Sequence, residues 1–114
     1  MKKAVLITGS SRGIGRAIAK KFALEGYNII INYNKSKEKA LSLLEQLLTS
    51  GTNAIAVQAD VSDRKQVEAM FKEGYEKFGK IDVLVNNAGI ADMTLFTDVT
   101  EEQWRRIFDV NVNG

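Results

Sequence analysis

Short apolar runs alternate along this chain with longer stretches of helical periodicity. Four runs rich in aliphatic and β-branched residues predict buried strands at Ala4–Thr8, Asn28–Tyr33, Ala54–Gln58 and Ile81–Val85. Apolar residues that recur every three or four positions predict helices over Gly13–Glu25, Ser36–Thr49 and Asp63–Phe78. Strands that are apolar throughout must be buried on both faces, so the alternation indicates an α/β fold with a Rossmann-like, doubly wound parallel sheet. Right-handed crossovers then favour the strand order 3-2-1-4.

The end of the sequence predicts a fourth helix, from Thr100 to about Asn113. Thr100 and Gln103 have the spacing of a capping box. At helical spacing one face would carry Trp104, Ile107, Phe108 and Asn111. The run Ile81–Val85 would then lack an outer neighbour, and such an apolar sheet edge favours self-association.

Composition narrows the possible functions. The 114 residues predict one domain, and the net charge of +2 comes without any block of five basic residues. We therefore expect no nucleic-acid or membrane partner, and a cytoplasmic location. The sequence has no cysteine and no histidine, which removes disulfides, thiolate chemistry and the commonest metal ligand. We expect no metal site, and any catalysis must use Asp, Glu, Lys, Tyr, Ser or Asn.

Three glycines follow the first predicted strand, in the stretch "LITGSSRGIG". Gly9, Gly13 and Gly15 lie in the turn that opens the first helix. The N–H groups of a helix N-terminus attract phosphate, and residues without Cβ let a pyrophosphate approach closely. The Lys-Ser/Thr pair that ends a Walker A loop is absent. This context favours a dinucleotide site over a glycine-rich turn without a ligand.

The end of the second predicted strand bears on the choice of cofactor. NAD-binding domains usually carry a carboxylate there for the ribose 2′-OH, but this chain has Asn32, Tyr33 and Asn34. Basic side chains surround this point at Arg12, Lys35 and Lys37. Cations favour a 2′-phosphate, so NADPH is the predicted cofactor. The alternative is that these are solvated surface charges.

Four motifs together resemble the short-chain dehydrogenase/reductase family. They are "TGSSRGIG" (Thr8–Gly15), Asp60-Val61, "NNAG" (Asn86–Gly89) and "NVNG" (Asn111–Gly114). The resemblance implies that Asp60 holds the adenine ring and that "NNAG" lines the cofactor cleft. The glycine motif, the strand end and the resemblance together nominate as cofactor contacts Thr8, Gly9, Ser11, Arg12, Gly13, Ile14, Gly15, Asn32, Tyr33, Asn34, Asp60, Val61, Asn87, Ala88 and Gly89.

The resemblance also implies a carbonyl/alcohol oxidoreductase with an Asn-Ser-Tyr-Lys tetrad, of which only Asn111 has a counterpart here. The pair Tyr33 and Lys37 has the family's Tyr-x-x-x-Lys spacing but straddles a strand end and a helix start, so we reject it as catalytic. The chain is expected to be a single cofactor-binding domain truncated at its fourth helix, inactive alone. The full-length protein is expected to form homo-oligomers.

The substrate class remains open at this stage. The motif set most resembles reductases of carrier-bound acyl groups in fatty acid synthesis, whereas Ile90–Trp104 looks more like reductases that act on a modified elongation factor. Both would reduce a small-molecule or carrier-bound carbonyl with NADPH. An alternative from another class is a non-catalytic dinucleotide-binding module.

Overall fold

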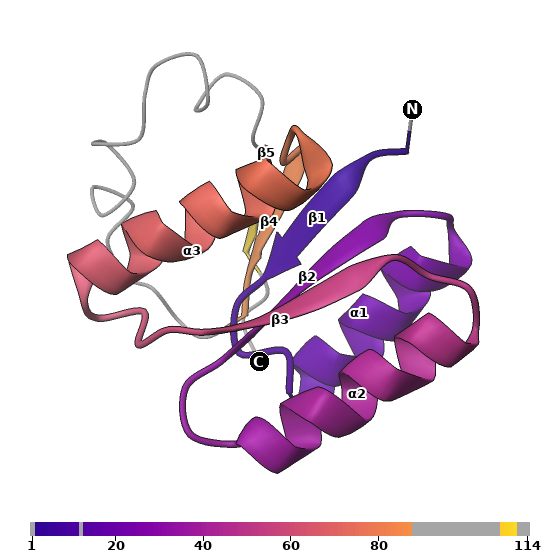
Figure 1. Ribbon diagram of the computed structural model, residues 1–114. Helices are drawn as coiled ribbons and strands as arrows, with labels where there is room; N and C mark the ends of the chain where they lie inside the picture. Colours follow the sequence, from indigo (N-terminus) through magenta and orange to yellow (C-terminus); the bar gives the residue numbers. More distant parts are fainter. Residues whose placement is uncertain (1, 12, 88–107, 112–114) are drawn as a thin grey trace.

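A parallel sheet forms the centre of the protein. The computed structural model describes residues 2–11, 13–87 and, for the backbone alone, 108–111. In these residues the strands lie in the order β3-β2-β1-β4-β5, and every neighbouring pair is parallel (Figure 1). Their bounds are β1 Ala4–Ile7, β2 Asn28–Tyr33, β3 Ala54–Gln58, β4 Val83–Asn86 and β5 Phe108–Asn111. The predicted order 3-2-1-4 is therefore confirmed, with one strand added beyond it.

Helices cover both faces of the sheet (Figure 1). Helices α1 (Gly13–Leu24) and α2 (Lys37–Thr49) pack on one face, and α3 (Arg64–Phe78) packs on the other. Alternate side chains of each strand supply the two cores. The α1/α2 side contains Val5, Ile7, Ile29, Ile31, Leu43 and Leu47. The α3 side contains Leu6, Ile30, Val57, Met70, Phe71 and Leu84.

The middle positions of the strands are apolar because both faces of the sheet are covered, whereas polar residues such as Asn32, Gln58 and Asn86 stand near their carboxyl ends. All four residues of β1 are fully buried. Leu6 lies opposite Ile30 on one side and opposite Leu84 on the other. This central placement of β1 brings the loop that follows it between the ends of β2 and β4, which is where a doubly wound sheet forms its ligand crevice.

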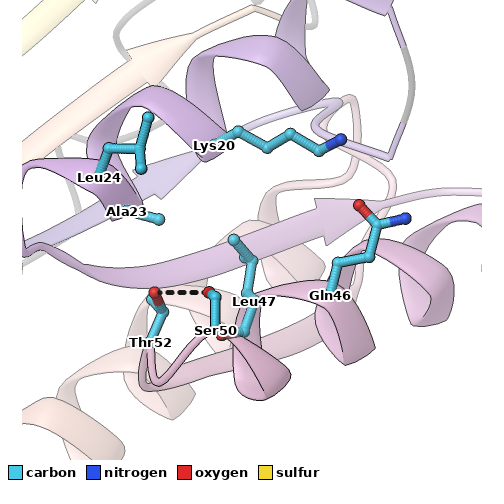
Figure 2. Close-up of a pocket in the computed structure, with 7 residues that line it drawn as sticks. All are labelled: Lys20, Ala23, Leu24, Gln46, Leu47, Ser50 and Thr52. Atoms are coloured by element: carbon cyan, nitrogen blue, oxygen red, sulfur yellow. Dashed lines mark hydrogen bonds between the residues drawn. The ribbon is translucent and has the colours of Figure 1, made fainter.

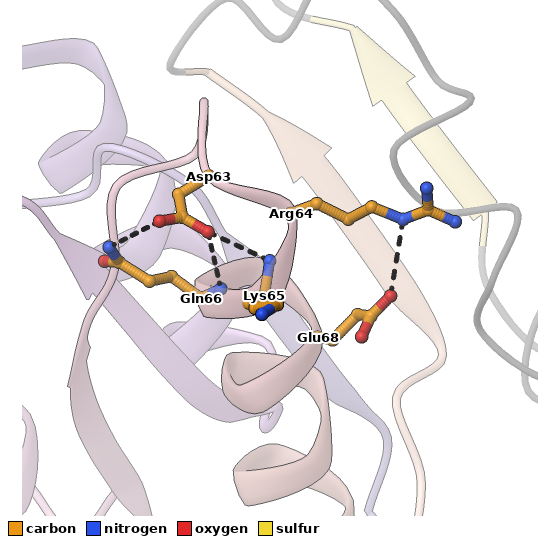
Figure 3. Close-up of polar contacts among 5 residues, drawn as sticks. All are labelled: Asp63, Arg64, Lys65, Gln66 and Glu68. Carbon is orange, nitrogen blue, oxygen red and sulfur yellow. Dashed lines mark hydrogen bonds and ion pairs between the residues drawn. The ribbon is translucent and has the colours of Figure 1, made fainter.

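The start of α3 is fixed by an aspartate cap (Figure 3). Asp63 precedes the helix, and its Oδ1 accepts from the backbone N–H groups of Lys65 (3.0 Å) and Gln66 (3.3 Å). The Gln66 side chain donates back from Nε2 to Asp63 Oδ2 at 3.1 Å. An exposed ion pair, Arg64 to Glu68 at 3.5 Å, follows on the first turn and contributes little. The helix therefore begins one residue after the predicted start, with Asp63 as its cap.

We expect Asp63→Ala to lower the free energy of unfolding by about 1 kcal/mol, because two helix N–H groups lose their acceptor. Urea denaturation followed by circular dichroism measures the change. Asp63→Ser is the control, since a serine oxygen can take the same two bonds. Equal losses in both variants would show that the cap is not the cause.

The predicted fourth helix is wrong over Phe108–Asn111, which form strand β5. Phe108 pairs with Val83 and Asn111 with Asn86, so β4 is not the free sheet edge that the helix would have left. Two physical reasons favour the strand. The backbone of β4 needs hydrogen-bond partners along its outer side, and Phe108 to Asn111 also alternate apolar and polar residues at the strand period. The predicted capping box of Thr100 and Gln103 lies outside the described residues.

No helix in the described part of the chain combines the length and apolar character needed to cross a membrane.

Candidate functional site

The glycine loop lies at the carboxyl edge of the sheet, between β1 and α1. Gly9 has φ +60° and Gly13 has φ +61°, a left-handed backbone that other L-residues rarely adopt. Gly13 is also the first residue of α1, so the loop delivers the chain directly to the helix N-terminus. The first turn of α1 contains no acidic residue, which leaves the positive end of its dipole uncompensated by a carboxylate there.

Gly15 is needed for close packing rather than for its backbone angle. A Cβ built on it would lie 2.4 Å from the Gly9 carbonyl oxygen and 2.9 Å from the Cα of Ser10. The same atom would lie 2.6 Å from Asn87 Nδ2, which donates to Gly9 O at 3.1 Å. The helix, the glycine loop and the residue after β4 thus meet with no room for a side chain.

Asn32, the fifth residue of β2, holds the glycine loop from the other side. The residue is 2% exposed, and its side-chain Oδ1 accepts the Gly9 N–H at 2.9 Å. Its Nδ2 donates to Ala59 O at 3.1 Å, with the carbonyls of Tyr33 and Val57 at 3.5 Å. The amide group therefore joins the loop after β1 to the end of β3. A cofactor contact by this side chain stays a prediction, and its observed partners are all protein groups.

Ser10 completes this junction and was missed by the sequence reasoning. Its backbone N–H donates to Asn32 O at 3.0 Å, and its Oγ accepts the Asn32 N–H at 3.0 Å. Nothing in "GSSRG" indicates which of the two serine side chains bonds to β2, so the sequence could not have identified Ser10. Thr8 is also fully buried, and its backbone N–H and hydroxyl both donate to Val85 O, at 3.0 and 3.4 Å.

A depression of about 340 Å³ opens beside the loop, at the ends of β1 and β2. Its lining residues are Gly9, Ser11, Tyr33, Asn34, Lys35 and Ser36. The structure therefore brings the predicted glycine loop and the predicted strand end together around one cavity. None of these lining residues is a carboxylate, so the cavity suits an anionic group.

Basic residues continue from this cavity onto α2. A neighbouring depression of about 410 Å³ is lined by Lys35, Ser36, Lys37, Glu38 and Lys39. Arg16 of α1 reaches across, and its Nη1 donates to Ser11 O at 3.4 Å and to Lys39 O at 3.2 Å. The guanidinium thereby ties the glycine loop to the start of α2.

Asp60 follows β3 at the same edge of the sheet. Its Oδ1 accepts from the Ser62 hydroxyl at 2.7 Å and from the Ser62 N–H at 2.9 Å. These two bonds, the hydroxyl first, lower the pKa of Asp60; burial opposes them, and the positive charge of Lys35 adds to the lowering. The carboxylate is therefore kept ionised, and Val61 beside it is half-buried.

The remaining predicted site residues divide into three groups. Ile14 is half exposed at the start of α1 and packs into neither core. Asn111 lies in β5 opposite Asn86 and not on a helix, which corrects its predicted setting. Arg12, Ala88 and Gly89 lie outside the described residues. Tyr33 ends β2 and Lys37 begins α2, as predicted, and their rejection as a catalytic pair stays a prediction.

A third depression, of about 530 Å³, lies at the opposite edge of the sheet between the ends of α1 and α2 (Figure 2). It is lined by Lys20, Ala23, Leu24, Gln46, Leu47, Ser50 and Thr52. Lys20 is the single ionisable side chain among these lining residues, and none of them belongs to the glycine loop. Among the described residues, no cluster of three or more His, Cys, Asp or Glu side chains could hold a metal.

An open parallel sheet with helices on both faces, and a glycine loop leading into the first helix, define a doubly wound α/β domain of the Rossmann type. The family profile described as short chain dehydrogenase matches residues 3–114. The chain therefore belongs to the short-chain dehydrogenase/reductase family.

Individual relatives agree with this assignment. The chain is 47% identical over all its 114 residues to a 3-oxoacyl-acyl-carrier-protein reductase of Staphylococcus aureus, of which it covers 46%. It is 46% identical over 112 residues to an uncharacterized oxidoreductase of Methylorubrum extorquens, of which it covers 45%. The chain thus spans about half the length of these curated relatives.

A solved structure shows the same fold. A short-chain dehydrogenase/reductase variant of Serratia marcescens superposes with a TM-score of 0.83 at 24% identity, over 98% of this chain and 55% of that one. At this identity the likeness concerns the fold alone.

Proposed function

We propose that this chain is the cofactor-binding part of an NADPH-dependent carbonyl reductase similar to 3-oxoacyl-acyl-carrier-protein reductase. The observation that carries the proposal is the cavity between the glycine loop and the end of β2, whose lining contains Lys35 and no carboxylate. The name of the Staphylococcus aureus relative supports the choice of substrate class, a carrier-bound 3-oxoacyl group.

The residues present fit a phosphorylated dinucleotide. Gly9 and Gly13 leave the N-terminus of α1 open to a pyrophosphate. Lys35 and Ser36 line the cavity where a ribose 2′-phosphate would be held, and Arg12 is proposed to join them. Asp60 supplies a hydrogen-bond acceptor for the adenine amino group. When bound, NADPH supplies the hydride for a carbonyl carbon; this chain's own residues bind and orient it.

The absence of a carboxylate from the cavity lining supports NADPH over NADH. A carboxylate at the end of β2 would accept from a 2′-OH and repel a 2′-phosphate, whereas lysine attracts the phosphate. We expect Lys35→Ala to weaken NADPH binding about fivefold and to leave NADH binding unchanged, the size of an exposed charge contact.

Titration of intrinsic NADPH fluorescence measures both affinities. Arg12→Ala is the companion variant, and an unchanged NADPH to NADH ratio would remove either residue from the role. Lys77→Ala, at the end of α3 and exposed, is the matched loss of one charge. If it weakened NADPH binding equally, the effect would come from net charge alone.

The catalytic step is proposed to need residues beyond those given. The one Tyr-x-x-x-Lys pair in these 114 residues, Tyr33 and Lys37, spans the end of β2 and the start of α2 and does not share one helix face. We expect the 114-residue chain to bind NADPH and not to oxidise it with a 3-oxoacyl thioester. A longer product of the same gene that carries a downstream Ser and Tyr-x-x-x-Lys should oxidise it. Turnover by the 114 residues alone would contradict this.

Two alternatives are separated by the same experiments. A reductase acting on 5-aminopentanone-modified elongation factor P would bind NADPH but leave 3-oxoacyl thioesters unreduced. A non-catalytic dinucleotide-binding module would bind NADPH with no active longer product. For the full-length protein we further propose a cytoplasmic homo-oligomer without nucleic-acid or membrane partners.

A further inference from the structure

Asp60 is held by hydrogen bonds at nearly every polar group. Its backbone N–H donates to Gln66 Oε1 at 2.9 Å, and its carbonyl accepts the Asp63 N–H at 2.9 Å. On the side chain, Oδ1 accepts both the hydroxyl and the N–H of Ser62. Within the described part of the chain, Oδ2 is the one polar atom of Asp60 without a hydrogen-bond partner. The fold thus presents a single carboxylate oxygen from a fixed turn.

Two bonds to one carboxylate oxygen restrict rotation of the whole group. A backbone N–H alone would make an ordinary Asx turn, about which the side chain can still adjust. The 2.7 Å hydroxyl bond is charge-assisted and therefore strong, and it is also the leading cause of the lowered pKa of Asp60. Ser62 itself is exposed, and its backbone N–H and its hydroxyl both donate to Asp60 Oδ1.

We propose that Ser62 is a positioning residue for base recognition: by occupying Oδ1 of Asp60 it presents Oδ2 as a fixed acceptor that selects adenine over hypoxanthine. This rests on the proposed function, in which Asp60 meets the base. Adenine carries an amino donor at C6, whereas hypoxanthine carries a carbonyl oxygen there. A fixed carboxylate oxygen binds the first and opposes the second, and an unmade or repulsive polar contact discriminates strongly.

Loss of the hydroxyl should relax this selection. In Ser62→Ala the carboxylate can rotate toward the N1–H that hypoxanthine offers in place of the C6 donor. The experiment compares the affinities of NADPH and reduced nicotinamide hypoxanthine dinucleotide phosphate by fluorescence titration. We expect the native chain to prefer NADPH by about tenfold or more, the size of one charge-assisted hydrogen bond. We expect Ser62→Ala to reduce that preference at least threefold, and Ser62→Thr to restore it.

A second variant separates positioning from loosening of the turn. Asp63→Ala weakens the cap of α3 but leaves both bonds from Ser62 to Asp60 in place. We expect it to keep the full preference for NADPH. The proposal is overturned if Ser62→Ala keeps the native preference, or if Asp63→Ala loses as much of it as Ser62→Ala.

Binding by the native chain separates a failure of the proposed function from a failure of the proposed role of Ser62. Binding of neither dinucleotide would overturn the proposed function itself. Equal binding of both would leave the function standing and overturn the role of Asp60 and Ser62 in reading the base.

Discussion

Replacing Asn32 with Asp is expected to destabilise the protein by about 3 kcal/mol at neutral pH instead of converting it to NAD specificity. The end of β2 is where an added carboxylate would be sought to hold a ribose 2′-OH. At position 32, however, the amide nitrogen donates to Ala59 O, and the carbonyls of Tyr33 and Val57 lie near it. A carboxylate oxygen in its place would face these carbonyl oxygens inside a site that is 2% exposed. The buried carboxylate would be repelled by these oxygens and would lose the hydrogen bond to Ala59 O, and both effects lower the free energy of unfolding.

The loss should depend on pH in a defined direction. Below the pKa of the introduced carboxyl, the protonated group can donate to Ala59 O in place of the amide. Burial and the facing carbonyls raise that folded-state pKa above the unfolded value, so the variant is least destabilised in acid and loses stability as the pH rises. Urea denaturation at pH 4 and pH 7, each relative to the native chain, tests this sign.

Asn34→Asp is the matched control, two residues further along the same chain. Asn34 is exposed and lines the cavity beside Lys35, so a carboxylate there remains solvated. We expect its stability to change by less than about 0.5 kcal/mol and its preference for NADPH over NADH to fall. An Asn32→Asp chain as stable as Asn34→Asp would show that the buried amide does not hold the loop.

The second large effect is expected at Gly15. Gly15→Ala places a Cβ 2.4 Å from the Gly9 carbonyl oxygen and 2.9 Å from Ser10 Cα, and both atoms belong to backbone. The loop must move as a whole, so we expect a loss of about 3 kcal/mol, at the upper end for overpacking, together with weaker NADPH binding. Urea denaturation and fluorescence titration measure the two effects.

Gly74→Ala separates steric conflict from the general effect of adding a methyl group to a helix. Gly74 lies in α3, where a Cβ would meet the Cδ1 atoms of Ile30 and Ile81 at 2.6 and 3.2 Å. These are the ends of flexible side chains, and alanine favours helix by about 1 kcal/mol over glycine. We expect a change in stability within about 1 kcal/mol, with NADPH binding unaltered. Equal losses at Gly15 and Gly74 would contradict the argument that rigid loop backbone sets the requirement for glycine.

The arrangement of the sheet was predictable from local pattern. Strands β1 to β3 begin where the apolar runs predict, because a strand buried on both faces can tolerate few polar residues. Alternation with helices then leaves few possible topologies, and the order of the first four strands follows. The glycine loop was likewise readable, since its composition and its place between strand and helix are both local.

The inner contacts of the site were not predictable in the same way. Asn32 and Asn34 are the same residue type two positions apart, yet one is buried and the other exposed. Ser10 and Ser11 are adjacent, yet only Ser10 bonds to β2 through its side chain. Each outcome depends on groups 22 to 27 residues away in the sequence, which become partners only once the sheet has formed.

The sequence by itself thus determined strands β1 to β4 of the doubly wound sheet, helices α1 to α3 and the glycine loop. The period of apolar residues, the placement of glycines and the helix caps each act over only a few residues. Tertiary structure alone decided which polar side chains support the loop and which line the cavity. Tertiary structure also decided the conformation of Phe108–Asn111, because these residues fit the pattern of a helical face and the alternation of a strand equally well. There the unpaired backbone of β4, distant in sequence, made the strand the conformation that satisfies more hydrogen bonds.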